Sequence, residues 1–244
     1  MNHLNRIALL AAALLLFASA SDAEDQAPEK PVHATANVGF VQTGGNTEVV
    51  TLLATDKLEW KRGAWAYTQE AGAVYGRDQG TENAGRYRVG LRTDYTFTPR
   101  VSLYGLASWK RDVFAGIERQ FDEGAGAVYH AILPQPQLLD FELGLGLLQR
   151  RSTEPVDASF STARVAARYK YFFTEKATFE AFGDWVVNLE DNEDSDAEAR
   201  AALAAPLASG LSLSLGYNAV YRSRPLPGLE RVDWTVSAGI QFSY

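Results

Sequence analysis

Apolar and polar residues alternate along most of this chain, in runs of about ten to twelve residues. From Asp233 to Tyr244 every second residue is apolar, beginning at Trp234, and the residues between are polar or small. A period of two is that of a β-strand with one apolar face. Turn residues separate the runs, and the pattern predicts twelve strands: 33–42, 48–61, 64–75, 85–97, 101–110, 120–133, 138–149, 160–173, 177–189, 196–205, 211–222 and 232–244.

The connections between the predicted strands alternate in length. Residues 61–64, 98–100, 134–137, 174–176 and 206–210 form short turns, whereas 76–84, 111–119, 150–159, 190–195 and 223–231 form longer polar loops. Long loops on one side and tight turns on the other are typical of outer-membrane barrels, whose turns face the periplasm. Only the first connection, 43–47, is short where this scheme expects a long one.

Large aromatic residues lie at both ends of the predicted apolar faces. Toward the turns we count Trp60, Trp65, Tyr95, Phe97, Tyr129, Tyr171, Phe173, Phe179, Phe242 and Tyr244, and toward the loops Tyr75, Tyr87, Trp109, Trp185, Tyr221 and Trp234. Two aromatic girdles are typical of a barrel that spans a membrane. A secreted soluble barrel would instead place its aromatic residues inside, around a ligand.

The two ends of the chain predict export and assembly. Arg6, the apolar run 7–17 and the small residues 18–20 form a signal peptide over residues 1–20. Residues 21–32 read as a flexible periplasmic lead-in, and 33–244 as the barrel. The C-terminal strand, with Gly239, Phe242 and Tyr244, resembles the signal by which barrels reach the barrel-insertion machinery.

Composition narrows the possible chemistry. The chain has no cysteine, which excludes disulfides, thiolate metal sites and a cysteine nucleophile. Loss of the signal peptide would leave 22 basic and 30 acidic side chains. This acidic balance argues against a nucleic-acid partner, which requires clustered Lys and Arg.

Charges of both signs recur on the faces predicted to point into the barrel. We expect a lumen network of Arg86, Arg88, Arg92, Asp140, Glu142, Arg164, Arg168, Lys170, Glu180 and Asp184, joined by Asp94, Tyr104 and Lys110. The turn after residue 173 places Lys170 opposite Glu180. Twelve strands are intermediate between side-chain-filled and channel-forming barrels. The lumen is therefore either closed by Arg–carboxylate networks or left with a narrow pathway for ions or solutes.

One outward face carries polar interruptions. The second strand exposes Asp56, and the third exposes Gln69. If the hairpin pairs residues whose numbers sum to 125, these two residues lie opposite one another, and a hydrogen bond would lower the cost of an outward acid. We interpret this outward polar pair as a docking point for another barrel or a lipid headgroup, with a bulge that turns both residues inward as the alternative.

The residue inventory gives little support to catalysis, and we predict no enzymatic activity, no cofactor and no metal site. His130 lies on the polar face of the sixth strand, and no local motif supplies a Ser–His or His–carboxylate pair, so we expect a satisfied interior residue. An acidic run from Glu190 to Glu198 lacks the glycine of a calcium loop, since Asp196 occupies that position. The basic pairs 110–111 and 150–151 are candidates for contact with lipid phosphates.

Three segments carry a family resemblance: residues 45–47 (Gly-Asn-Thr), the loop 111–119 leading into 124–126, and the aromatic C-terminus. Together they resemble the YdiY-like family of salt-induced outer-membrane proteins, over about residues 34–244. The resemblance implies an outer-membrane barrel of unassigned activity and supplies no catalytic residues.

The sequence thus predicts an all-β protein, a transmembrane antiparallel β-barrel of about twelve strands in the cell outer membrane. We expect a non-enzymatic monomer, in contact with outer-membrane lipid and lipopolysaccharide, that contributes to envelope integrity, salt-stress response or restricted passage of small solutes. A lipid hydrolase of the outer membrane and a secreted ligand-binding barrel are the alternatives.

Overall fold

The computed structural model describes residues 32–44, 49–78, 81–133, 136–153, 157–174 and 177–243. The predicted signal peptide, the lead-in up to residue 31, and Tyr244 lie outside these ranges. So do residues 45–47, part of the family resemblance. No helix in the described ranges is long and apolar enough to span a membrane.

Twelve strands form, one for each predicted run of alternating residues. They are β1 (Val32–Gly44), β2 (Val49–Arg62), β3 (Trp65–Asp78), β4 (Thr81–Thr98), β5 (Val101–Asp112), β6 (Ile117–Ile132), β7 (Gln137–Ser152), β8 (Asp157–Phe172), β9 (Thr178–Asn188), β10 (Ser195–Ala208), β11 (Leu211–Arg222) and β12 (Val232–Ser243). A short 3-10 helix, η1 (Val113–Ala115), joins β5 to β6. The fold class predicted from the alternation is confirmed.

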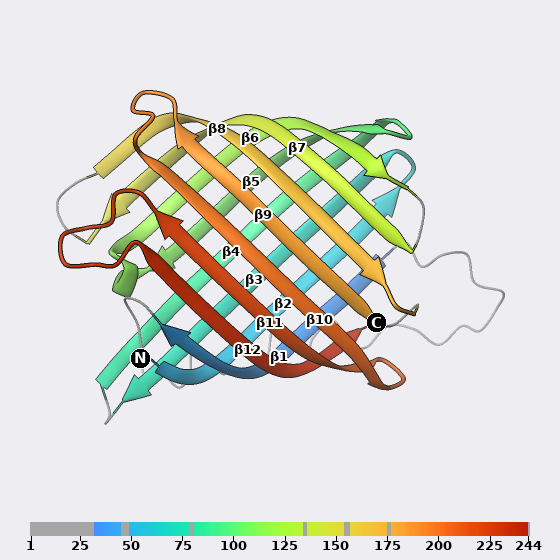
Figure 1. Ribbon diagram of the computed structural model, residues 1–244, viewed down its shortest axis with the longest axis horizontal. Coiled ribbons are helices and arrows are strands. Elements are labelled where there is room, and N and C mark those ends of the chain that lie inside the picture. The colour runs from blue at the N-terminus through green and yellow to red at the C-terminus, as the bar shows by residue number, and fades with distance from the viewer. Residues whose placement is uncertain are drawn as a thin grey trace. The chain divides into compact units, whose positions relative to one another are not determined.

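The strands form one closed antiparallel barrel in which each strand pairs with its neighbours in sequence (Figure 1). The ring closes where β1 pairs with β12, from Thr35 opposite Ser243 to Gly44 opposite Trp234. Closure satisfies the backbone groups that an open sheet would leave at its two edges.

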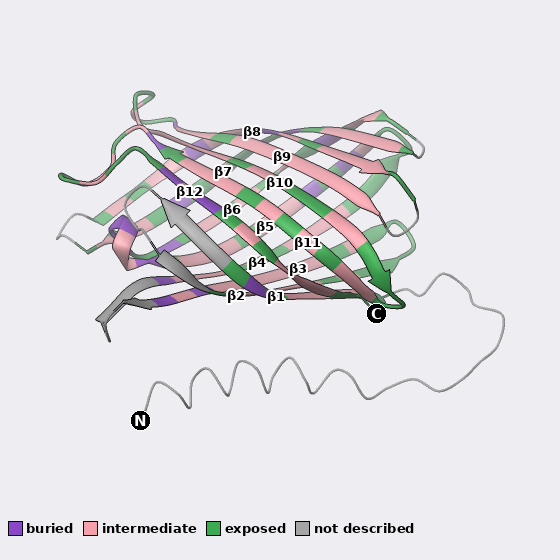
Figure 2. Ribbon diagram, turned by 60° about the horizontal axis from the view of Figure 1, so that its bottom comes forward, coloured by how far each residue is buried: buried purple, intermediate pink, exposed green. Residues whose placement is uncertain are grey.

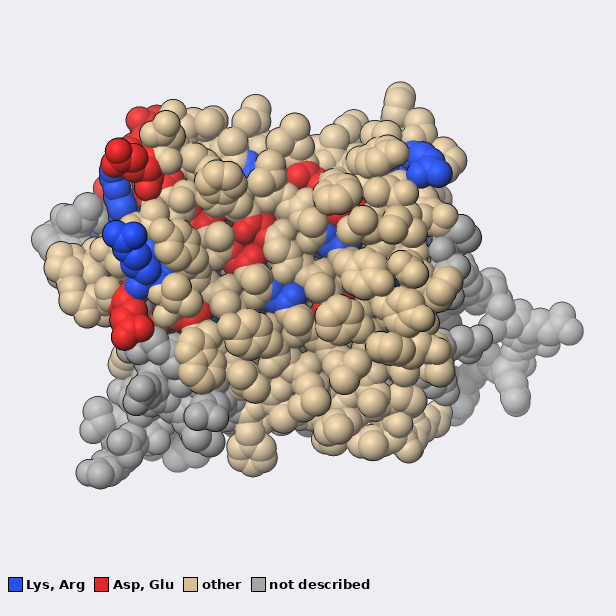
Figure 3. All heavy atoms as spheres, viewed as in Figure 1, with Lys and Arg blue, Asp and Glu red and all other residues tan. Residues whose placement is uncertain are grey.

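The backbone alternation sorts side chains into an outer apolar surface and an inner polar one. On β7, Leu143 and Leu145 are 65% and 66% exposed, whereas Glu142 on the opposite face is 4% exposed. Exposed and less exposed positions follow one another along the strands (Figure 2). In the space-filling view, uncharged residues cover most of the visible strand surface, and the largest group of charged side chains lies at one rim, with smaller charged patches across the face and at the other end (Figure 3).

The seam between β1 and β12 depends on a pair of glycines. Gly39 lies directly opposite Gly239, and a Cβ at Gly239 would lie 2.5 Å from the carbonyl oxygen of Val38. The two backbones therefore approach more closely than any larger residue permits. Gly239, which the sequence predicts to be part of an assembly signal, has this packing role at the seam.

The predicted register between β2 and β3 is wrong by two residues. Asp56 pairs with Ala71, and Gln69 pairs with Leu58, so the two outward polar residues are not opposite one another. The reason is the turn: Gly63 adopts φ +59°, and a two-residue loop pairs Arg62 with Trp65. The direct Asp56–Gln69 hydrogen bond that we expected is not available in this register.

Three of the predicted long loops are largely strand. β3 and β4 continue to Asp78 and from Thr81, residues 111, 112 and 117–119 belong to β5 and β6, and residues 150–152 and 157–159 belong to β7 and β8. Polar residues at these strand ends mark where the apolar surface stops, but backbone pairing continues beyond it. The connection between β11 and β12, 223–231, is a true long loop.

Candidate functional site

The centre of the lumen is organised around one buried carboxylate. The side chain of Glu142 on β7 is 2% exposed. It accepts hydrogen bonds from Nη1 of Arg92 on β4, at 3.0 Å to each oxygen, and from Nη1 of Arg164 on β8 at 2.7 Å. β4 and β7 are three places apart in the ring, so this contact ties non-adjacent strands together through the lumen.

Tyr104 on β5 supplies a platform for these arginines. A Cβ at Gly126 would lie 2.8 Å from its ring, and a Cβ at Gly144 would collide with its hydroxyl, so the two glycines make room for the ring against the wall. The Arg92 guanidinium lies 4.5 Å from the ring centroid, and Arg164 donates to the hydroxyl at 3.4 Å. Stacking on an aromatic face fixes the guanidinium planes.

Two further carboxylates complete the charge balance of this central cluster. Arg92 also binds Asp94 through Nε and Nη2, at 2.8–3.0 Å, and Arg164 binds Asp184 at 3.0 Å. Both arginines are thus shared between two acids. Such networks resist disruption because removal of one partner leaves a buried charge uncompensated.

A second set of ion pairs crosses the lumen. Nη1 of Arg88 on β4 lies 3.6 Å from Glu198 on β10, and β4 and β10 stand six places apart in the ring of twelve, on opposite walls. Nη1 of Arg200 on β10 similarly lies 3.9 Å from Glu70 on β3. We call Glu70, Arg88, Glu198 and Arg200 the crossing set.

The crossing set is loosely held and partly exposed. Its pairs are 3.4–3.9 Å long, none meets hydrogen-bond geometry, and Arg200 Nε has no hydrogen-bond acceptor among the described groups. The Arg88 and Glu70 side chains are 41% and 40% exposed although both point into the barrel. Exposed side chains on the inner face mean that there is open space in the lumen around them.

Shorter contacts occupy the loop side of the lumen. Arg150 donates to Gln120 at 2.6 Å and to Asp196 on β10 at 2.5 Å, again across three strands. The remaining pairs lie closer to the wall: Arg86 with Asp112 at 2.6 Å, and Arg222 with Asp233 at 2.8 Å. Two basic pairs in the sequence, 110–111 and 150–151, are candidates for contact with lipid phosphates. In each pair the first residue, Lys110 or Arg150, lies on the inner face.

On the turn side, Lys170 lies opposite Glu180 as predicted, with 2.5 Å between Nζ and Oε1. Arg168, by contrast, lies 3.6 Å from Glu142 and 5.5 Å from the ring centroid of Phe182, and its side chain is 44% exposed. Its cross-strand neighbour Asp140 is already bonded to His130. Arg168 is therefore less tightly compensated than Arg92 and Arg164.

A hydrogen-bonded series joins β5, β6 and β7 near the turns. His130 Nε2 lies 2.9 Å from Ser102 Oγ, and His130 Nδ1 lies 2.6 Å from Asp140 Oδ1. Both ring nitrogens have partners, so the prediction of a satisfied interior histidine is confirmed. The order of groups is that of a serine hydrolase, but Ser102 is 3% exposed, so no ester reaches its hydroxyl in this arrangement.

The long loop 223–231 reaches across the mouth of the barrel. Leu226 packs directly on Gly116, the residue that follows η1. A Cβ added to Gly116 would also lie 3.3 Å from Cδ1 of Leu229. The β5–β6 and β11–β12 connections are six strands apart, on opposite sides of the ring of twelve. Ala115 and Ile117 are 6% and 2% exposed beneath this contact. We call loop 223–231 the leucine lid.

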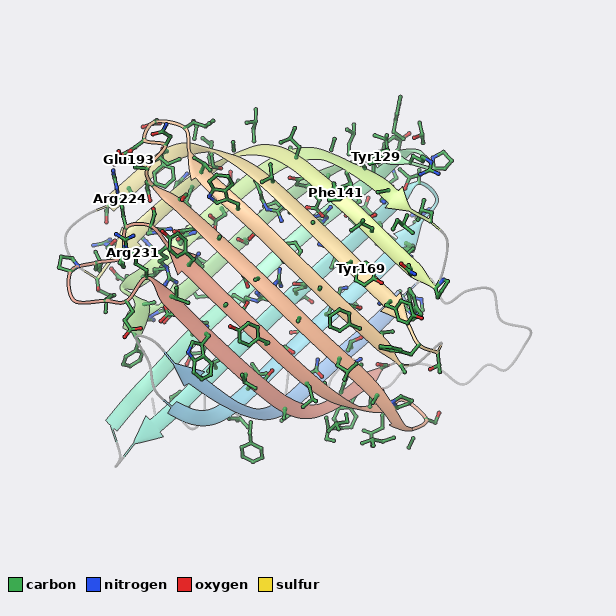
Figure 4. The ribbon with its side chains drawn as sticks, in the orientation of Figure 1. Tyr129, Phe141, Tyr169, Glu193, Arg224 and Arg231 are labelled. Atoms are coloured by element: carbon green, nitrogen blue, oxygen red, sulfur yellow. The ribbon has the colours of Figure 1, made fainter. Side chains whose placement is uncertain are left out.

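The lid is also held by charge at the rim. Arg224 binds Asp191 and Glu193 of the β9–β10 loop, and these hydrogen bonds raise the pKa of its guanidinium. Glu193, Arg224 and Arg231 lie together at the loop side, at the opposite end from Tyr129 and Phe141 (Figure 4). The acidic run thus has a cationic partner, and within the described residues no group of acids or histidines has the geometry of a metal site.

Several functional contacts were not predicted. The alternation identifies which residues point inward, but it does not show which of them meet across the lumen, as in the crossing set. Likewise, Ser102 carries no motif that links it to His130. Glu123, an exposed residue on the outward face of β6, was overlooked, although its position two residues after Phe121 reveals its orientation.

Comparison with known proteins places the chain in a family. Residues 36–244 match the family described as "Protein of unknown function, DUF481". The chain belongs to this family. The match is consistent with the YdiY-like resemblance, and a search of curated proteins found no match.

Two solved structures share the fold. One is the NanC porin, with 10% identity and a TM-score of 0.57, covering 85% of this chain and 98% of that chain. The other is the translocator domain of the autotransporter NalP from Neisseria meningitidis, with 13% identity and a TM-score of 0.52, covering 98% of this chain and 96% of that chain. At such low identity these likenesses establish the barrel and not an activity.

Proposed function

We propose that this protein is a non-enzymatic barrel of the outer membrane that permits only restricted passage of ions or small solutes. The observation that carries this proposal is the crossing set, in which loosely held, partly exposed charges from opposite walls of the lumen meet. A lumen filled by tightly bonded side chains throughout would not leave Arg88 and Glu70 so exposed.

The outward surface supports the location. Leucine, valine and aromatic side chains are widely exposed on it, among them Phe40 at 73% and Leu145 at 66%. Hydrocarbon around the barrel would remove this apolar area from water, which is favourable in proportion to the area. We orient the barrel as other outer-membrane barrels are oriented, with the short turns facing the periplasm and the lid facing outward.

The lid and the crossing set act at different depths. Leucine contacts cover the loop-side mouth, while ion pairs restrict the middle of the lumen. Because the crossing pairs are long and partly exposed, each contributes little to stability, about 0–1 kcal/mol. Their rearrangement to admit a solute therefore costs little, unlike that of the cluster around Glu142.

Single-channel recording in planar bilayers tests the proposal. The refolded protein should show small conductance, and the double substitution Arg88→Ala with Glu198→Ala should raise it, because the bridge between opposite walls is lost. Lys170→Ala is the matched control, since it removes a lumen charge whose ion pair, among the described residues, is with Glu180 on the adjacent strand. Absence of conductance in the wild type and in the double variant would refute passage through the lumen.

A further inference from the structure

Three arginines form a row on the outer surface at the loop side. Arg119 on β6 lies directly opposite Arg151 on β7. Arg111 follows Lys110, which pairs with Gln120, the residue after Arg119. Arg111 lies at the irregularity in the β5–β6 register between Lys110 and Asp112, and so close to the level of Arg119. All three are exposed, unlike Lys110 and Gln120 on the inner face. We call them the arginine row.

The row is poorly compensated by the protein itself. Arg151 has an ion pair with Glu118 at 3.1 Å and lies opposite Asp157 on β8. Among the side chains that the structure describes, no hydrogen bond or ion pair joins Arg111 or Arg119 to an acceptor. Like charges directly opposite on one face of a sheet are destabilising. An external anion between Arg111, Arg119 and Arg151 would remove this repulsion.

The level of the row fits a lipid headgroup. Trp109 and Phe121 pair with one another two residues closer to the middle of the barrel, on the same outward face. Phe121 is 44% exposed, and aromatic residues in this position mark the boundary of the hydrocarbon. The guanidinium groups therefore lie about 7 Å further along the tilted strands, or about 5 Å further out along the membrane normal, toward the headgroup phosphates.

We propose that the arginine row binds the phosphate groups of lipopolysaccharide in the outer leaflet. Each guanidinium presents paired N–H donors that match phosphate oxygens in bidentate fashion, and no acceptor among the described side chains competes for those of Arg111 and Arg119. The inference rests on the proposed orientation, with the loops facing outward. It assigns a ligand to the outer wall, separate from any solute of the lumen.

The test uses the refolded full chain in detergent, with lipid binding measured by native mass spectrometry. The triple substitution Arg111→Gln, Arg119→Gln and Arg151→Gln should weaken lipopolysaccharide binding by about tenfold or more. Arg62→Gln, an exposed outward arginine at the turn side, should leave binding unchanged. Enzymatically dephosphorylated lipopolysaccharide should bind wild type and triple variant equally weakly.

A second measurement separates binding from folding. Arg119→Gln alone should leave the thermal unfolding midpoint without lipid unchanged or higher, because it removes like-charge repulsion, yet reduce the increase produced by lipopolysaccharide. Equal binding by wild type and triple variant would overturn the assignment. A stabilisation by inorganic phosphate equal to that by the lipid would show that the row takes free phosphate instead. Conductance does not depend on the arginine row. A protein that binds lipopolysaccharide but shows no conductance would therefore refute solute passage and leave the lipid-binding inference intact.

Discussion

At the scale of single residues, Glu142 determines the stability of the side-chain network in the lumen. Its carboxylate is almost fully buried and receives hydrogen bonds from two arginines on different strands. The Glu142→Ala substitution should destabilise the barrel by about 3–5 kcal/mol, because Arg92 and Arg164 lose a shared buried partner.

Glu180→Ala provides the control for this prediction. That side chain is 45% exposed and its pair with Lys170 lies on adjacent strands, so its loss should cost less than about 1 kcal/mol. Urea unfolding in lipid vesicles, followed by gel migration without heating, measures both. Equal destabilisation by the two substitutions would contradict the distinction between the central cluster and the peripheral pairs.

At the scale of elements, the leucine lid is the feature most open to manipulation. Replacing Leu226 and Leu229 by Ser removes the apolar contact with Gly116, so the loop should leave the mouth more often and the channel should spend more time open. Leu207→Ser, at an exposed leucine of β10, should have no such effect. Open probability in single-channel records is the measurement, and identical values in both variants would exclude a gating role for the lid.

The strands were predictable from sequence because period-two alternation and turn residues are local properties. The register between strands was harder to predict. The turn at Gly63 shifts the pairing of β2 with β3 by two residues from the predicted one, because local polarity does not reveal which turn forms. The lid and the crossing set depend on which loops and side chains lie opposite one another after closure. Those contacts follow from the order of strands in the ring and from side-chain reach, neither of which a single strand specifies.

At the scale of the whole molecule, the account requires hydrocarbon outside the barrel and water inside. The chain contains no cysteine, so single cysteines introduced along β11 report each face separately. Leu213 and Leu215 point outward at 40% and 46% exposure, and Ser214 between them points toward the lumen, where its hydroxyl donates to the carbonyl of Gly239.

Reactivity of these three positions with a water-soluble maleimide, in protein reconstituted into vesicles, tests this claim most directly. We expect Ser214→Cys to be labelled from the aqueous lumen, and Leu213→Cys and Leu215→Cys to be protected by lipid until detergent is added. Equal labelling at all three positions before detergent would contradict a barrel whose outer surface faces hydrocarbon.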